Sequence, residues 1–115
     1  MNVLFIITDQ QRADMLHCYG NDVIKTPNID KLASESIRFS NAFCNSPMCM
    51  PNRATILTGY YPNVHGVRSN GINLPNEIPT ITDTLVKRGY HTISIGKTHF
   101  NTWTARYNPK TKSAE

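Results

Sequence analysis

The chain has 115 residues, of which 39% are hydrophobic and 17% charged, and its formal net charge is +4. This balance is typical of a folded chain and excludes an intrinsically disordered one, while the length allows one small domain. The basic residues are scattered instead of forming a block, which argues against a nucleic-acid partner.

The longest apolar run near the N-terminus covers only residues 3–7. Such a run is too short to span a bilayer or to form the apolar part of a signal peptide, so we expect no membrane partner. If Met1 is the native start, the expected compartment is the cytoplasm. If a leader has been removed, the protein is periplasmic or secreted.

The three cysteines are Cys18, Cys44 and Cys49, and they include no C-x-x-C pair. This spacing favours neither a zinc site nor a disulfide framework. We expect Cys18 and Cys44 to be buried thiols. Cys49 is set apart by the residues that follow it.

The first part of the chain predicts a strand, a helix and a second strand. Residues 3–7 (VLFII) are continuously apolar, which is typical of a strand buried on both faces of a parallel sheet. Thr26 and Pro27 predict an N-cap and a first helical residue, and apolar side chains follow at helical spacing. Residues 37–43 (IRFSNAF) then alternate like a strand.

The second part predicts two helices, a loop and a third strand. A helix is expected over residues 51–57, where a glycine follows, and residues 60–79 are expected to form a long functional loop. Thr80 and Asp83 resemble a capping box at the start of another helix. Residues 91–95 (HTISI) predict the third strand.

This order of elements indicates an α/β fold, with a mainly parallel sheet flanked by helices. We expect residues 1–107 to form one folded domain and residues 108–115 to form a polar, disordered tail. In such sheets the ligand crevice lies beyond the carboxyl ends of the strands. Asp9 and Lys97 both follow predicted strands, so we expect them to face one crevice.

The clearest chemical pattern is the segment CMPNRATILTG, which begins at Cys49. A nucleophile at the start of a helix lies beside exposed N–H groups and the positive end of the dipole, which stabilise an anion. Pro51 is tolerated in the first turn because its missing N–H would have had no helical partner. Arg53 is one turn further on the same face, where its planar guanidinium can bind a tetrahedral oxyanion.

The pattern C-x-P-x-R followed by T-G resembles the signature of the sulfatase family, in which the cysteine is oxidised to formylglycine. Four further segments resemble the same family and follow its order along the chain. They are residues 2–10 (NVLFIITDQ), 26–33 (TPNIDKLA), 60–67 (YYPNVHGV) and 89–99 (GYHTISIGKTH). The resemblance therefore extends over almost the whole chain.

The resemblance implies an alkaline-phosphatase-like fold and a sulfuric ester hydrolase. Cys49 would become formylglycine, whose hydrated aldehyde attacks the sulfur of a sulfate ester and then releases sulfate. Asp9 and Gln10, together with residue 49, would bind calcium or magnesium. Arg53 would orient the formylglycine.

The same resemblance implies roles for four residues later in the chain. Lys97 and His99 would hold the sulfate and the developing charge. His65 would support the site from behind, and Asn70 would contact the substrate. The implied partners are a small-molecule or saccharide sulfate ester and the enzyme that oxidises the cysteine.

Ordinary structural roles compete with several of these assignments. Asp9 and Gln10 also suit a polar turn after a strand, and Arg53 alone suits a solvated helix residue. His65 fits loop hydrogen bonding as well as it fits the site. The combination of motifs favours the functional role for the first three residues and leaves His65 open.

The chain also departs from the family pattern. Thr98 stands where an aromatic residue is usual, and Gln10 replaces an aspartate of many members. The later metal ligands of the family, an Asp followed by Asn or His, have no counterpart here. We therefore expect a truncated, N-terminal sulfatase fragment that is incomplete in isolation. Its unpaired sheet edge and uncovered apolar face predict either self-association or a proteolysed remnant of a longer chain.

The sequence is also compatible with two other functions. A phosphonate monoester or phosphodiester hydrolase of the same superfamily would use the same nucleophile and metal. Such enzymes usually have Tyr and Thr in place of Lys97 and His99, so the sequence favours a sulfatase. A non-catalytic remnant or binding module is the second alternative.

Overall fold

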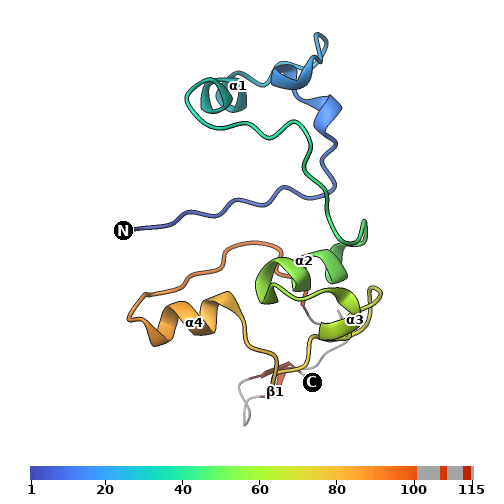
Figure 1. Ribbon diagram of the computed structural model, residues 1–115, viewed down its shortest axis with the longest axis vertical. Coiled ribbons are helices and arrows are strands. Elements are labelled where there is room, and N and C mark those ends of the chain that lie inside the picture. Colours follow the sequence, from blue (N-terminus) through green and yellow to red (C-terminus); the bar gives the residue numbers. More distant parts are fainter. Residues whose placement is uncertain (101–106, 109–112, 115) are drawn as a thin grey trace. The chain divides into compact units, whose positions relative to one another are not determined.

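A computed structural model describes residues 1–100, 107–108 and 113–114, and it divides into two units, Met1–Phe43 and Cys44–Glu115. The first unit contains the 3-10 helices η1 (Ala13–Met15) and η2 (His17–Tyr19) and helix α1 (Pro27–Ser34) (Figure 1). The second unit contains helices α2 (Cys49–Thr58), α3 (Pro62–His65) and α4 (Ile81–Lys87). It also contains the two-residue strands β1 (Tyr107–Asn108) and β2 (Ser113–Ala114), which pair antiparallel.

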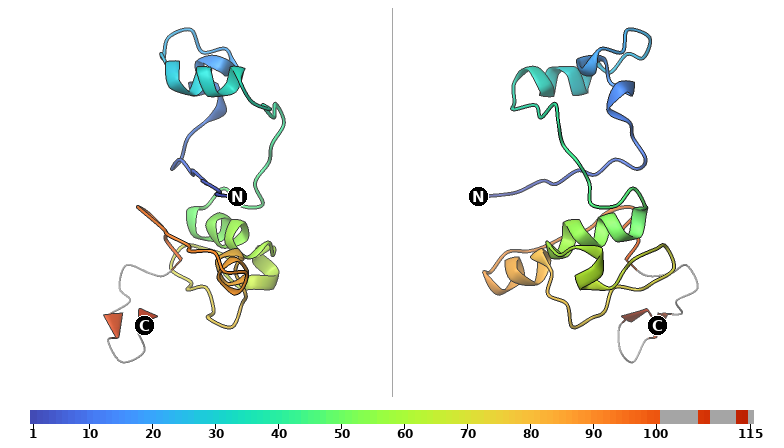
Figure 2. Two further views of the ribbon diagram at one scale, coloured as in Figure 1. Left: turned by 90° about the vertical axis from the view of Figure 1, so that its left-hand side faces the viewer. Right: turned by 45° about the vertical axis from the view of Figure 1, so that its right-hand side comes forward.

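In the first unit, hydrogen bonds to Thr26 and Asp30 tie α1 to η2, which lies against it in both views of Figure 2. The Asp30 carboxylate accepts from the backbone N–H of Cys18 at 2.9 Å and from the Thr26 hydroxyl at 3.0 Å. That hydroxyl in turn accepts from the N–H of His17 at 3.1 Å. Thr26 thus occupies the predicted N-cap position of α1, but its side chain serves η2 instead of capping α1.

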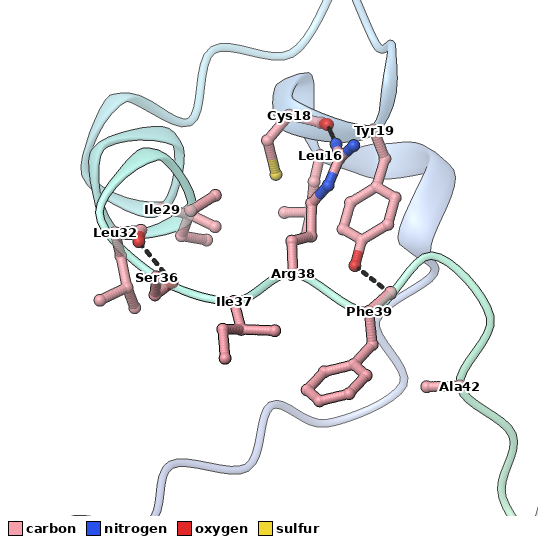
Figure 3. A pocket seen from close by; sticks show the side chains of 11 residues that line it. Leu16, Cys18, Tyr19, Ile29, Leu32, Ser36, Ile37, Arg38, Phe39 and Ala42 are labelled. Carbon is pink, nitrogen blue, oxygen red and sulfur yellow. Dashed lines mark hydrogen bonds between the residues drawn. The ribbon is translucent and has the colours of Figure 1, made fainter.

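An open, mainly apolar groove lies beside α1 in the first unit (Figure 3). Its apolar lining includes Leu16, Ile29, Leu32, Ile37 and Phe39. The Arg38 guanidinium donates to the carbonyl of Cys18 and lies 4.9 Å from the centre of the Tyr19 ring. The Tyr19 hydroxyl donates to the Phe39 carbonyl at 2.8 Å, so two side chains hold the segment after α1 against η2.

None of the three predicted strands forms within residues 1–100. Residues 3–7, 37–43 and 91–95 take part in no strand pairing there, and their large apolar side chains are open to solvent. Leu4 is 85% exposed and Ile95 is 93% exposed. A strand is stabilised by hydrogen bonds to a neighbouring strand, and in the described residues these segments have none. The sheet therefore stays a prediction.

The helix expected over residues 51–57 is confirmed and begins two residues earlier, as α2. It ends at Gly59, whose φ of +74° is the left-handed conformation that glycine adopts without strain. Met50 and Ala54 of α2 pack with Val67 to form the core of this unit, and Leu74 lies against it.

The segment between α2 and α4 was expected to be a long loop, and that expectation is wrong in one part. Pro62 begins the short helix α3, which ends at His65. Pro62 suits the first turn because it has no N–H to leave unpaired. The backbone N–H of Val64 and that of His65 donate to the Tyr61 carbonyl at 2.8 and 3.0 Å.

Further sequence predictions concern the burial of two thiols, the C-terminal tail and membrane-spanning helices. The expectation of buried thiols is wrong for Cys44, which is exposed, whereas Cys18 is half-buried. The predicted tail of residues 108–115 lies mostly outside the described residues, so its disorder stays a prediction. In the described part of the chain, no helix has the length and apolar character needed to cross a membrane.

The predicted capping box at the start of α4 is confirmed. The Thr80 hydroxyl accepts from the Asp83 N–H at 3.2 Å, and the Asp83 carboxylate accepts from the Thr80 N–H at 2.8 Å. The Thr80 hydroxyl also donates to the Asp83 carboxylate at 2.6 Å, and this bond, together with the one from the Thr80 N–H, lowers the pKa of Asp83 below its ordinary value. The two side chains thus satisfy two donors at a helix end that would otherwise rely on water.

We expect Thr80→Ala to fray the first turn of α4, because the hydroxyl that caps Asp83 is lost. A missing N-cap costs about 1 kcal/mol of helix stability. Amide hydrogen exchange at Asp83 should therefore quicken about fivefold, which NMR can measure. Thr80→Ser keeps the hydroxyl and is the matched control. Equal exchange rates in the two variants would contradict the role of the hydroxyl.

Candidate active site around the start of helix α2

The half-buried Cys49 is the first residue of α2. The N-cap residue Met48 makes no side-chain capping bond. Instead, the side-chain oxygen of Asn70 accepts from the backbone N–H of Met50 at 3.0 Å. The hydroxyl of the buried Ser46 accepts from the N–H of Met48 at 3.3 Å. Side chains from outside the helix therefore hold the backbone on both sides of Cys49.

Arg53 is buried one turn after Cys49, with only 8% of the residue exposed. Its Nη1 donates to the backbone carbonyl of Lys97 at 2.8 Å. A buried guanidinium is costly unless its donors are hydrogen-bonded, and this bond meets part of that requirement. The structure thus brings Arg53 and the backbone of Lys97 together. That the side chains of Arg53 and Lys97 together bind an anion stays a prediction.

The segment that carries Lys97 and His99 is also held from a second side. The backbone N–H of Leu74 donates to the carbonyl of Phe100 at 3.1 Å. His99 is half-buried and has a φ of +55°. In the described residues, the only other non-glycine residue with a positive φ is Gln10, at +50°. Left-handed backbone is uncommon for such residues and is enriched at functional sites.

His65 is completely buried, and both of its ring nitrogens are used inside the second unit. Nδ1 accepts from the backbone N–H of Val67 at 3.1 Å, and Nε2 lies 3.1 Å from the Thr55 hydroxyl. Because Nδ1 accepts a hydrogen bond, the ring is neutral and its proton is on Nε2. Burial lowers the pKa of His65, which favours the same neutral state.

The bonds of His65 support the structural alternative for this residue, since they join α3 and the segment after it to α2. Thr55 was not among the predicted residues. A hydroxyl in a helix has many possible partners, so the sequence held no signal that would have paired it with His65. The support that His65 was expected to lend to the site is thus an indirect one, through the position of α2.

Asp9 and Gln10, the predicted metal ligands, belong to the first unit, and both are exposed. The other predicted residues belong to the second unit. These are Cys49, Arg53, His65, Asn70, Lys97 and His99. The contacts of the second unit therefore involve the predicted nucleophile and the predicted anion-binding residues, whereas the predicted metal ligands Asp9 and Gln10 belong to the first unit.

Among the described residues, no three His, Cys, Asp or Glu side chains gather into a group that could hold a metal ion. Asp9 and Gln10 provide the hard oxygen atoms that calcium and magnesium prefer. Calcium takes about six to eight such ligands. The described residues thus fit part of a site for either ion but do not fit a complete one.

Comparison with known proteins relates the chain to sulfatases. The family model described as Sulfatase matches residues 1–112. The chain is 42% identical over 100 residues to sulfatase YidJ of Escherichia coli (strain K12), covering 87% of this chain and 20% of that protein. It is 37% identical over 98 residues to an N-acetylglucosamine-6-O-sulfatase of Bacteroides thetaiotaomicron, covering 85% of this chain and 18% of that protein.

A solved structure of a YidJ sulfatase from Bacteroides fragilis matches 93% of this chain and 25% of its own chain, with a TM-score of 0.79 and 32% identity. Sulfatases of known structure have an alkaline-phosphatase-like fold, so that part of the fold prediction is confirmed. The chain spans about a fifth of the length of the curated relatives that it matches.

The buried, neutral His65 predicts an acid-sensitive second unit. Its ordinary pKa is 6.5, and the folded value is lower, so below about pH 6.5 the unfolded chain binds more protons than the folded one. The stability that the neutral ring contributes is therefore fully present above pH 6.5 and is lost as the pH falls toward the lowered folded pKa. Thermal unfolding followed by circular dichroism between pH 7.5 and 5.5 measures this loss.

His65→Asn provides the test of this assignment. Asparagine can keep the acceptor for the Val67 N–H but loses the bond to Thr55, at a cost of about 1 kcal/mol. We expect this variant to be less stable at pH 7.5 and to lose less stability on acidification. His91→Asn, at an exposed position, is the control and should retain the wild-type pH dependence. An unchanged pH dependence in His65→Asn would rule out His65 as its source.

Proposed function

Since this chain belongs to the sulfatase family, we propose that it is the part of a sulfuric ester hydrolase that carries the nucleophile and the anion-binding cations. One observation carries the proposal. Cys49 begins a ten-residue helix, and the buried Arg53 lies one turn further on and is bonded to the backbone of Lys97. This arrangement puts the residue to be modified at the positive end of a helix dipole, one turn away from a buried guanidinium.

In the proposed reaction, Cys49 is first converted to formylglycine by a maturation enzyme. Formylglycine would supply a hydrated aldehyde. One hydroxyl would attack sulfur and displace the alcohol of the ester, and loss of the proton from the other hydroxyl would then expel sulfate and restore the aldehyde. The residues of this chain position the reacting groups. α2 fixes the backbone of residue 49. The guanidinium of Arg53 keeps one orientation because the residue is buried. Lys97 and His99 bind the sulfate oxygens.

We also propose that Asp9 and Gln10 supply part of a site for calcium or magnesium. Such an ion would neutralise sulfate oxygens and lower the pKa of the attacking hydroxyl. The support is the chemistry of the two oxygen-bearing side chains and the left-handed backbone of Gln10, three residues after the predicted strand 3–7. Residue 49 would supply a further ligand, and the remaining ones would come from outside these 115 residues.

The substrate that we propose is a sulfate ester of a small molecule or saccharide. A relative 37% identical to this chain is named an N-acetylglucosamine-6-O-sulfatase, which supports a saccharide ester as the first class to test. The exposed Lys97 and the buried Arg53 are positive groups that suit the sulfate end of such a substrate. They do not discriminate between sugars.

For the fold of the complete protein, we propose that residues 3–7, 37–43 and 91–95 are strands of a mainly parallel sheet. All three segments expose large apolar side chains, for which a sheet covered by helices would provide burial. Without neighbouring strands, the same segments offer unpaired backbone groups and apolar surface to other copies. We therefore also propose that this chain self-associates in solution.

The test of the enzymatic proposal is hydrolysis of aryl esters by a full-length protein that contains this segment, produced together with a maturation enzyme. We expect faster turnover of a sulfate ester than of a phosphonate ester. Cys49→Ala should lower kcat/KM by about 10³-fold or more, because the nucleophile is lost. Arg68→Lys, at an exposed position, is the control and should retain activity.

Faster turnover of the phosphonate ester would favour the phosphonate hydrolase alternative. Mass spectrometry of the peptide covering residues 39–53 checks the modification separately. Conversion of cysteine to formylglycine lowers the mass by about 18 Da, a product outside the usual thiol oxidation series. An unmodified thiol after production with the maturation enzyme would contradict the proposed role of Cys49.

Self-association of the 115-residue chain can be measured by sedimentation velocity over a range of concentrations. We expect the average mass to rise with concentration, because apolar side chains such as Leu4 and Ile95 are almost fully exposed. Leu4→Lys combined with Ile95→Lys should shift the distribution toward the monomer. Asn63→Lys adds a charge at an exposed position of α3 and is the control. A monomer at all concentrations would refute the proposal.

A further inference from the structure

The segment that follows α3, residues 66–71, packs against the N-terminal half of α2 and makes two hydrogen bonds to Met50. Val67 is 1% exposed and packs in the core with Met50 and Ala54. The N–H of Gly71 is directed at the Met50 sulfur, at a distance of 3.1 Å. Gly71 has a φ of +96°, a conformation in which any larger residue would be strained. The segment therefore has a defined path that ends beside the first turn of α2.

Asn70 is the residue of this segment that reaches the helix end itself. Its side-chain oxygen accepts from the N–H of Met50, the residue directly after Cys49. Pro51 has no N–H, and the N–H of Asn52 donates to the Met48 carbonyl at 3.1 Å. The Met50 N–H is thus a donor of the first turn that the helix cannot satisfy by itself, and a side chain 20 residues later satisfies it.

From this geometry we propose that Asn70 is a positioning residue, which fixes the backbone of residue 49 by capping the start of α2 from a distance. The inference rests on the proposed function in one respect, since it takes residue 49 as the nucleophile precursor. It differs from the substrate contact expected from the sequence, because the Asn70 oxygen is directed at Met50. The neutral amide also caps the helix without adding a negative charge next to an anionic substrate, which an aspartate would do.

The experiment compares the 115-residue chain with the variants Asn70→Ala and Asn70→Asp, and with Asn63→Ala as the control at an exposed position. Amide exchange at Met50, measured by NMR, reports the cap directly. We expect Asn70→Ala to quicken this exchange about fivefold, as loss of an N-cap does. Asn70→Asp keeps the acceptor and should retain the wild-type rate, and Asn63→Ala should leave it unchanged.

The second measurement is the rate of alkylation of Cys49 by iodoacetamide at fixed pH, resolved by peptide mass spectrometry, with the exposed Cys44 as internal reference. Asn70→Ala should raise the Cys49 rate severalfold, because the first turn frays and exposes the thiol. Asn70→Asp should lower it below wild type, because a carboxylate beside the helix end disfavours the thiolate that reacts. The rate at Cys44 should stay constant across the variants.

Two results would overturn the proposal. The first is a Met50 exchange rate that Asn70→Ala leaves unchanged, or that Asn63→Ala raises as much. The second is a constant ratio of Cys49 to Cys44 alkylation across the variants, which would show that any change is general loosening. Neither measurement requires sulfate hydrolysis, so a failure of the proposed enzymatic function is distinguishable from a failure of this inference.

Discussion

The first turn of α2 depends on hydrogen bonds from residues outside the helix, and the geometry of the candidate site depends on that turn. Pro51 removes one N–H from the turn, and Asn70 accepts from the N–H of Met50. The core formed by Met50, Ala54 and Val67 then keeps the capping segment in place. The position of residue 49 is therefore determined by a small packed cluster and not by the helix alone, which in isolation would be too short to persist.

Burial determines the orientation of Arg53 and the protonation state of His65, two polar residues that contact this cluster. Arg53 is almost completely removed from water, so its guanidinium depends on acceptors such as the Lys97 carbonyl and points in a fixed direction. His65 is removed from water entirely and is held neutral by the bond from the Val67 N–H. One buried side chain thus links α2 to the segment that carries Lys97, and the other links it to the segment that carries Asn70.

The predicted strand segments differ from this cluster, because their apolar side chains are exposed. Leu4 and Ile95 belong to runs whose composition is typical of buried strands, yet they lie open to solvent. The likeness to a solved sulfatase covers nearly all of this chain but only a quarter of that structure. A chain of this length can therefore build the surroundings of α2 from its own residues, whereas a sheet needs strands that the described residues do not provide.

The sequence alone determined the features that depend on neighbours within about four residues or on motif spacing. These are the presence of a helix over residues 51–57, the Gly59 terminator, the Thr80–Asp83 capping box and the sulfatase family itself, because caps and helical bonds are local. Only the tertiary structure decided which side chains meet α2 from afar. Asn70 and Met50, His65 and Thr55, and Arg53 and Lys97 are separated by 20, 10 and 44 residues, and no local preference encodes such pairs. The predicted strands are unpaired within residues 1–100 for a related reason, since a strand is stabilised by neighbours that local sequence cannot supply.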